Sequence, residues 1–124
     1  MKNKILLIED DNIFQKLIKD GLSKSFEFFA AQDGEKGIKV AKDEKPDLIL
    51  LDLILPKKDG FEVLEELKND AELSHIPVVV LTNLGGAEDI EKATSLGAYT
   101  YLVKSDYTLE DLLEKVRSAT QINE

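Results

Sequence analysis

Several short apolar runs of this sequence are followed directly by polar side chains that could bind a ligand or take part in a reaction. They are Glu9, Asp10 and Asp11 after Ile5–Ile8, Asp52 after Leu48–Leu51, Thr82 after Val78–Leu81, and Lys104 after Tyr101–Val103. Clustered carboxylates repel one another and raise one another's pKa unless a cation joins them. Hard oxygen ligands of this kind suit Mg²⁺, and a set without histidine or cysteine argues against zinc.

An aspartate in such a set can act as a nucleophile toward phosphorus and form an aspartyl-phosphate. This transfer depends more on neutralising the phosphoryl oxygens than on acid–base groups, and a metal, a lysine and a hydroxyl supply that. The sequence therefore predicts a phosphoryl acceptor site. Asp52 is its nucleophile, Glu9 and Asp10 hold the metal, Lys104 is the counter-charge and Thr82 is the hydroxyl donor.

The apolar runs that precede these residues are predicted to be strands. The first three are nearly unbroken, as in strands buried on both faces of a parallel sheet. A further run, Phe26–Ala31, carries Glu27 and indicates a more exposed strand. The three prolines lie at the edges of apolar runs, where turns are expected.

Five stretches have apolar residues at helical spacing: Ile13–Leu22, Ile38–Ala41, Phe61–Leu67, Ile90–Leu96 and Leu109–Ala119. We expect the second helix to be shorter than the first. Asp11 and Asp59 are expected to cap the first and third helices, and Thr108 with Asp111 has the spacing of a capping box before the fifth. Gly97 is expected to end the fourth.

The elements therefore alternate, strand then helix, five times over. This alternation predicts an α/β fold, a doubly wound parallel sheet with helices on both faces. A five-strand chain suits the strand order 2-1-3-4-5, in which the first and third strands are neighbours at the switch point. Ligands of such sheets bind outside the carboxyl ends of the strands, which is where the acidic residues fall.

Length and composition limit the functions open to the chain. Residues 1–124 are expected to form one domain, and the absence of cysteine excludes disulfides and thiolate metal sites. The formal net charge of −9 argues against nucleic acid as a direct ligand. The apolar runs are too short for a membrane span, and the first is too short for a signal peptide. We expect a cytoplasmic domain that binds neither nucleic acid nor membrane.

Five motifs together resemble the receiver domain of response regulators in bacterial two-component signalling. They are Ile5-Leu6-Leu7-Ile8-Glu9-Asp10-Asp11, Asp47-Leu48-Ile49-Leu50-Leu51-Asp52-Leu53, Leu55-Pro56-Lys57-Lys58-Asp59-Gly60, Val80-Leu81-Thr82, and Gly97-Ala98 followed by Tyr101-Leu102-Val103-Lys104. They occur in order over essentially the whole chain. The resemblance implies a flavodoxin-like (βα)5 fold similar to that of single-domain chemotaxis regulators.

The resemblance also implies roles for individual residues. Asp52 would be the phosphorylation site and would bind Mg²⁺ (or Mn²⁺) together with Asp10. Glu9 would act at the metal mostly through water, and Ile54 would contribute its backbone carbonyl. Lys104 would bind the phosphoryl group.

A switch and its partners are implied as well. Thr82 and Tyr101 would form the switch pair, in which the hydroxyl moves toward the phosphoryl group and the ring turns inward. A sensor histidine kinase or phosphotransfer protein would supply the phosphoryl group. The face of the fourth helix, fifth strand and fifth helix would present the result to a downstream protein. Such a domain is no enzyme beyond its own phosphorylation and dephosphorylation.

Three features depart from the family pattern. Ser105 follows Lys104 where the family usually has proline after a cis bond, which favours a trans bond here. Asn83 replaces a small residue and narrows access to the site. Ile54 and Leu84 are apolar, and we hypothesise that they shield the phosphoryl group from water.

Three other functions are alternatives for such a chain. Phosphatases of the haloacid dehalogenase type carry a second aspartate two residues after the nucleophile, where this chain has Ile54. A flavin carrier would need a phosphate loop after the first strand, where Glu9, Asp10 and Asp11 would repel a phosphate. A receiver-like module that binds a partner without being phosphorylated stays open, because Asn83 and Ser105 depart from the pattern.

Overall fold

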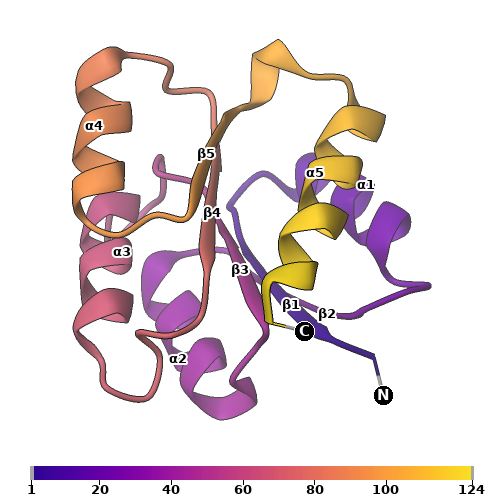
Figure 1. The fold of residues 1–124 in the computed structure, drawn as a ribbon, viewed down its shortest axis with the longest axis horizontal. Helices are drawn as coiled ribbons and strands as arrows, with labels where there is room; N and C mark the ends of the chain where they lie inside the picture. The colour runs from indigo at the N-terminus through magenta and orange to yellow at the C-terminus, as the bar shows by residue number, and fades with distance from the viewer. Residues whose placement is uncertain (1, 124) are drawn as a thin grey trace.

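The fold is one five-stranded parallel sheet with helices on both faces (Figure 1). The computed structural model describes residues 2–123, and side-chain surroundings for residues 2–121. The strand order is β2-β1-β3-β4-β5, and every neighbouring pair is parallel. The strands are β1 (Lys4–Ile8), β2 (Glu27–Ala31), β3 (Leu48–Leu51), β4 (Val78–Thr82) and β5 (Thr100–Val103). The predicted fold class and strand order are confirmed.

The helices fall into two layers. Helices α1 and α5 cover one face of the sheet, and α2, α3 and α4 cover the other (Figure 1). They are α1 (Asn12–Leu22), α2 (Gly34–Glu44), α3 (Gly60–Asn69), α4 (Ala87–Ser95) and α5 (Leu109–Ala119), with 3₁₀ turns η1 (Lys104–Asp106) and η2 (Thr120–Asn123). Among the described residues, no helix has both the length and the apolar character needed to cross a membrane.

Helix α2 corrects one expectation. It has 11 residues, as many as α1 and α5, so the prediction of a shorter second helix was wrong. Its inner face contains Gly34 and Gly37, both buried. A Cβ on Gly37 would lie 2.5 Å from Cδ1 of Ile8, so the helix packs on the sheet through its backbone. Only Ile38 and Ala41 of the buried face are apolar side chains, so the glycines extend the helix without adding to the hydrophobic pattern.

The predicted caps are present. Asp11 accepts from the N–H groups of Ile13 and Phe14, at 2.9 and 3.2 Å. Asp59 accepts from Glu62 N–H at 3.0 Å, and Thr108 Oγ1 accepts from Asp111 N–H at 3.1 Å. Gly97 follows α4 with φ of 105°, a left-handed conformation that glycine adopts readily. These caps fix where the helices begin and end relative to the strands.

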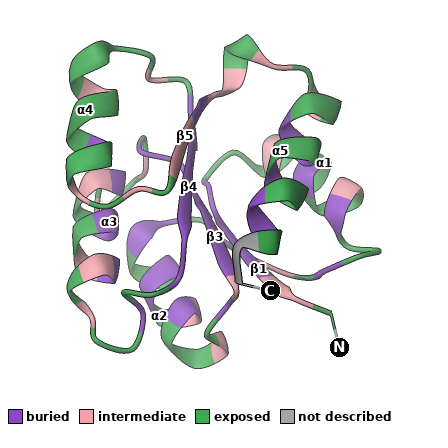
Figure 2. Cartoon of the chain, in the orientation of Figure 1, coloured by how far each residue is buried: buried purple, intermediate pink, exposed green. Residues whose placement is uncertain are grey.

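The core consists of two apolar layers, one on each side of the sheet (Figure 2). Every residue of β3 and β4 is buried, and so are Ile5–Ile8 of β1. Strand β2 is mostly half-buried or exposed, as its glutamate predicted. The central strands are therefore held rigidly, and this packing fixes the positions of the residues at their carboxyl ends.

Candidate functional site

The predicted acidic residues meet at the carboxyl ends of β1 and β3. The two strands are paired, with Ile8 opposite Leu51, and Asp52 N–H donates to Ile8 C=O at 3.0 Å. Glu9 and Asp52 therefore leave neighbouring strands at the same edge. One carboxylate oxygen from each of Glu9, Asp10 and Asp52 lies within 4.8 Å of the others.

These carboxylates differ in their exposure to water. Glu9 is 1 % exposed and Asp52 is 5 % exposed, whereas Asp10 lies at the surface. An ionised carboxylate is expensive to bury without a charged partner or strong hydrogen bonds. The site is thus open on the side of Asp10 and depends on nearby cations and donors on the inner side.

Lys104 supplies the inner positive charge. Its Nζ pairs with Oε1 of Glu9 and lies 3.4 Å from Oδ2 of Asp52, and its side chain is only 12 % exposed. The structure has no cis peptide bond among the described residues, so the Lys104–Ser105 bond is trans, as expected. The ammonium group therefore bridges the two buried carboxylates.

The pKa of the Glu9 carboxyl is unusually high. Burial raises the pKa of the Glu9 carboxyl to about 7. The hydrogen bond from Lys104 opposes this rise in pKa, and the neighbouring Asp52 carboxylate adds to it. When all three carboxylates are ionised, a single ammonium leaves them under-compensated. A divalent cation fits this set, because it would supply the missing charge through oxygen ligands of the kind it prefers.

The loop after Asp52 is fixed by a close approach of the chain. Ile54 N–H donates to Oδ1 of Asp52 at 3.2 Å, and Gly60 N–H donates to Leu53 C=O at 3.0 Å. A Cβ on Gly60 would lie 2.3 Å from Cα of Leu53 and 2.5 Å from the carbonyl oxygen of Asp52. Only glycine fits there, so the start of α3 holds the backbone of Asp52 in place.

The two predicted switch residues lie on β4 and β5. Thr82 is the last residue of β4 and fully buried, and its Oγ1 accepts from Leu84 N–H at 3.4 Å. Tyr101 is half-buried, and its hydroxyl donates to Leu84 C=O at 2.6 Å. Burial, with the charges of Asp89 and Asp52, raises the pKa of Tyr101, so this hydroxyl stays a donor at neutral pH. Both residues thus contact the start of the β4–α4 loop.

Sequence reasoning missed two residues that support the site. The Nζ of Lys104 lies 4.2 Å from the ring centroid of Phe14, a residue that the sequence indicates only as part of the apolar stripe Ile13–Leu22. Gln15 Nε2 donates to the backbone carbonyl of Glu9. Neither contact has a signal in the sequence, because each depends on how α1 packs beside β1. Asp11 is an exposed cap of α1, as predicted.

Known proteins resemble this chain in sequence and in fold over most of its length. Residues 5–117 match the sequence profile of the response regulator receiver domain. The chain is 40 % identical over 116 residues to the DNA-binding dual master transcriptional regulator RpaA of Synechocystis sp., covering 93 % of this chain and 48 % of RpaA. It is 34 % identical over 105 residues to the polar-differentiation response regulator DivK of Brucella anthropi, covering 84 % of this chain and 85 % of DivK.

Solved structures of response regulators have a fold similar to that of this chain. The phosphorylated cyanobacterial phytochrome response regulator RcpA superposes with a TM-score of 0.85 at 37 % identity, covering 96 % of this chain and 91 % of RcpA. The Mn²⁺-bound response regulator Rcp1 gives a TM-score of 0.82 at 36 % identity, covering 97 % and 93 %. The chain spans about half the length of RpaA and of the ycf27 regulators that it also resembles.

Proposed function

Because the chain belongs to the response regulator receiver domain family, we propose that phosphorylation of Asp52, in a reaction that needs a divalent cation, switches its binding to a partner. One observation carries the proposal. A carboxylate oxygen of the buried Asp52 lies within 4.8 Å of carboxylate oxygens of Glu9 and Asp10, and Oδ2 of Asp52 lies 3.4 Å from the ammonium group of Lys104. The residues proposed as nucleophile, metal ligands and counter-charge therefore lie together at the carboxyl ends of the strands.

In the proposed reaction, a carboxylate oxygen of Asp52 forms a bond to phosphorus as the bond from phosphorus to the donor's leaving group breaks. The leaving group departs with the bonding electron pair. Lys104 neutralises charge on the transferred phosphoryl group, and Thr82 donates its hydroxyl hydrogen to a phosphoryl oxygen. A divalent cation held by Asp10 and Asp52 neutralises further charge when it is bound.

Divalent metal binding at the acidic pocket is a property of this family. We propose Mg²⁺ as the ion, with Mn²⁺ as a substitute, since a relative of known structure, Rcp1, binds Mn²⁺. In this proposal Asp10 and Asp52 are direct ligands and Glu9 acts mostly through water. Ile54 contributes its backbone carbonyl. The pairing of Glu9 with Lys104 supports the indirect role, because it occupies one Glu9 oxygen.

The proposal extends to the switch and its partners. A sensor histidine kinase or a phosphotransfer protein in the cytoplasm supplies the phosphoryl group. Thr82 and Tyr101 transmit the change to the face made by α4, β5 and α5, where a downstream protein binds. Their shared contact with Leu84 supports this route. Residues 1–124 act as a single receiver domain that catalyses only its own phosphorylation and dephosphorylation.

Beryllofluoride, a phosphoryl mimic, tests this proposal without a kinase. We expect it to bind in the presence of Mg²⁺ and to shift the amide resonances of Thr82, Leu84 and Tyr101 in a ¹⁵N-labelled sample. Asp52→Asn should abolish the shifts, whereas Asp11→Asn, beside the site, should retain them. Absence of any shift in the wild-type protein would favour a receiver-like module that binds partners without phosphorylation.

A further inference from the structure

Strand β2 is an edge of the sheet with unused backbone groups. Glu27 N–H donates to Asn3 C=O, and Glu9 N–H donates to Ala31 C=O, both at 2.9 Å, so these groups of β2 face β1. Backbone groups of successive strand residues point to opposite sides, so the N–H and C=O groups of Phe28 and Ala30 face outward. Within residues 2–123, no strand pairs with that side. Such an edge can accept another strand.

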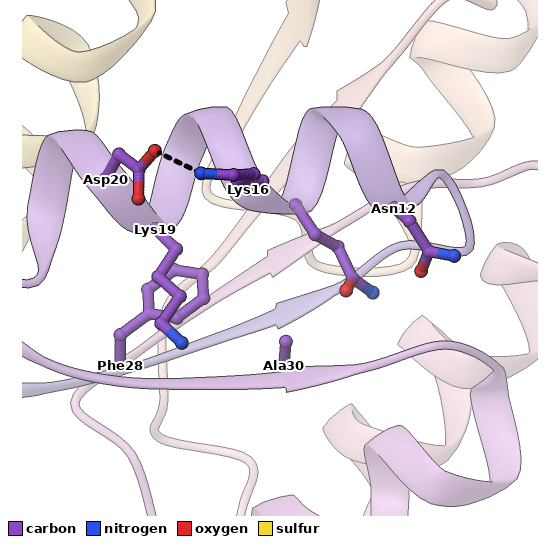
Figure 3. Close-up of a pocket in the computed structure, with 7 residues that line it drawn as sticks. Asn12, Lys16, Lys19, Asp20, Phe28 and Ala30 are labelled. Carbon is purple, nitrogen blue, oxygen red and sulfur yellow. Dashed lines mark hydrogen bonds and ion pairs between the residues drawn. The ribbon is translucent and has the colours of Figure 1, made fainter.

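The edge is hollowed along its whole length. One hollow of about 420 Å³ lies between β2 and α1 and is lined by Lys16, Lys19, Phe28 and Ala30, among others (Figure 3). A second, of about 600 Å³, lies between β2 and α2. A third, of about 530 Å³, continues past the start of β2. Ala30 is exposed and small, which leaves the outward backbone groups accessible.

The walls of these hollows are basic. Six lysines and three carboxylates line them, in a chain whose formal net charge is −9. On α1, Lys19 extends toward Phe28 and Lys16 extends toward Asp20 (Figure 3), and Lys36 and Lys39 of α2 line the second hollow. Lys16 pairs with Asp20 at 3.2 Å, but the other three form no ion pair with a described residue. Strand β2 itself has only one charged residue, Glu27.

We propose that the edge of β2 binds an extended acidic segment of a partner protein, which adds to the sheet as a sixth strand. Outward backbone groups of Phe28 and Ala30 would supply the hydrogen bonds, as in other cases of strand addition. Side chains of an added strand alternate between the two faces. Acidic residues on one face would meet Lys16 and Lys19, and those on the other would meet Lys36 and Lys39.

Charge also argues against the other occupants of such an edge. A second copy of this chain paired edge to edge would bring two lysine-lined walls together, and like charges repel. Nucleic acid would not pair with the outward N–H and C=O groups as a strand does. The net negative charge of the chain also repels phosphate backbones. Four of the six lysines, Lys16, Lys19, Lys36 and Lys39, lie on α1 and α2 beside the strand, so they favour an acidic strand and disfavour pairing between two such edges.

A designed peptide tests the proposal. The probe is a blocked peptide of about eight residues, made of glutamate and threonine with glutamates on both faces of its extended form. We expect saturable binding to the ¹⁵N-labelled chain, with shifts and slowed amide exchange at Phe28 and Ala30. The same peptide N-methylated at alternate backbone positions keeps its charge but loses the hydrogen bonds, and we expect it not to bind. Equal binding of the two peptides would overturn strand addition.

Two variants separate backbone bonding from charge. Ala30→Pro removes one outward N–H at an edge position where proline is tolerated, and should abolish binding. The pair Lys19→Glu and Lys39→Glu should weaken binding at least about tenfold. A matched pair with the same change of net charge, Lys92→Glu and Lys115→Glu on α4 and α5, should leave binding unchanged. Beryllofluoride binding at Asp52 should persist in all of these variants, which confirms that they are folded.

Other results would overturn the proposal. Absence of binding by the acidic peptide would do so, and so would binding of a lysine–threonine peptide of equal length with equal affinity. Tighter binding of a single-stranded oligonucleotide would assign the surface to nucleic acid. A dimer in sedimentation velocity that Ala30→Pro dissociates would assign the edge to a second copy of the chain.

Discussion

The ammonium group of Lys104 lies 4.2 Å from the centroid of the Phe14 ring while it also contacts the carboxylates of Glu9 and Asp52. The ring is half-buried and lies on α1. An ammonium group over an aromatic face is attracted to the ring by about 0.5–1 kcal/mol at a partly exposed position. Phe14 therefore helps to hold the Lys104 ammonium group beside the Asp52 carboxylate.

Replacing Phe14 by leucine should slow phosphorylation of Asp52 by acetyl phosphate about two- to fivefold, the rate equivalent of losing that attraction. Phe14→Tyr, which keeps an aromatic face, should restore the rate. Stopped-flow or quenched-flow kinetics with mass detection measure this. Phe61→Leu is the matched control, because it removes a similar contact, with Lys92 at 4.3 Å, away from the site. Equal slowing by both leucine variants would refute the assignment.

The raised pKa of Glu9 predicts how stability varies with pH in the metal-free protein. The pKa of this carboxyl is 4.5 ordinarily and about 7 in the fold. The folded state therefore holds a proton that the unfolded state has released. The contribution of Glu9 to stability is complete below pH 4.5, falls as pH rises from there, and is lost above about pH 7.

Urea unfolding in EDTA across pH 4.5–8 measures this effect. The wild-type free energy of unfolding should fall across that window relative to Glu9→Gln, which has no carboxyl to titrate. Mg²⁺ at pH 8 should recover stability in the wild type by binding the folded state. Parallel curves for the two proteins would show that Glu9 titrates normally.

Gly60 offers a test of how the site is held together. A Cβ there would meet the backbone of Leu53 and Asp52, which cannot move aside without displacing the acceptor residue. Gly60→Ala should lower the free energy of unfolding by about 1–3 kcal/mol and slow phosphorylation as well. Gly85→Ala is the control, since its nearest side-chain contact would be 3.6 Å away. Thermal unfolding and phosphorylation rates compare the two, and unchanged stability of Gly60→Ala would contradict the packing argument.

Two apolar residues are expected to lengthen the life of the phosphoryl group. Ile54 is 54 % exposed and follows Asp52 by two residues, and Leu84 is half-buried two residues after Thr82. If they shield the acyl phosphate from water, Ile54→Asn and Leu84→Glu should each speed dephosphorylation. The decay of the phosphorylated mass after removal of the phosphodonor measures the rate. Rates equal to the wild type would rule the shield out.

The fold and the meeting of the acidic residues could be predicted because each depends on strand ends. The unbroken apolar runs of β1, β3 and β4 define where the strands stop, and parallel pairing brings their carboxyl ends to one edge. Glu9, Asp10 and Asp52 therefore had to converge once the order β1–β3 was adopted. Caps such as Asp59 and Thr108 were predictable because they are local.

The partners of Lys104 could not be predicted in the same way. Lys104 pairs with Glu9 across 95 positions of the chain, and the choice of Glu9 together with Asp52 depends on side-chain rotamers and burial. The role of Phe14 depends on how α1 lies against the η1 turn. Helix α2 was predicted too short because the first part of its packing face is Gly34 and Gly37, and the close approach of Gly37 to Ile8 leaves no hydrophobic signal.

The central claim is that Asp52 accepts a phosphoryl group with the help of a divalent cation. Intact mass after incubation with acetyl phosphate tests it most directly, with Mg²⁺ or with EDTA, for the wild type, Asp52→Asn and the neighbouring control Asp11→Asn. We predict one added phosphoryl group in the wild type and in Asp11→Asn with Mg²⁺, and none in EDTA or in Asp52→Asn. Phosphorylation that persists in Asp52→Asn or in EDTA, or no added mass in a wild-type protein that also fails to bind beryllofluoride, would contradict the account.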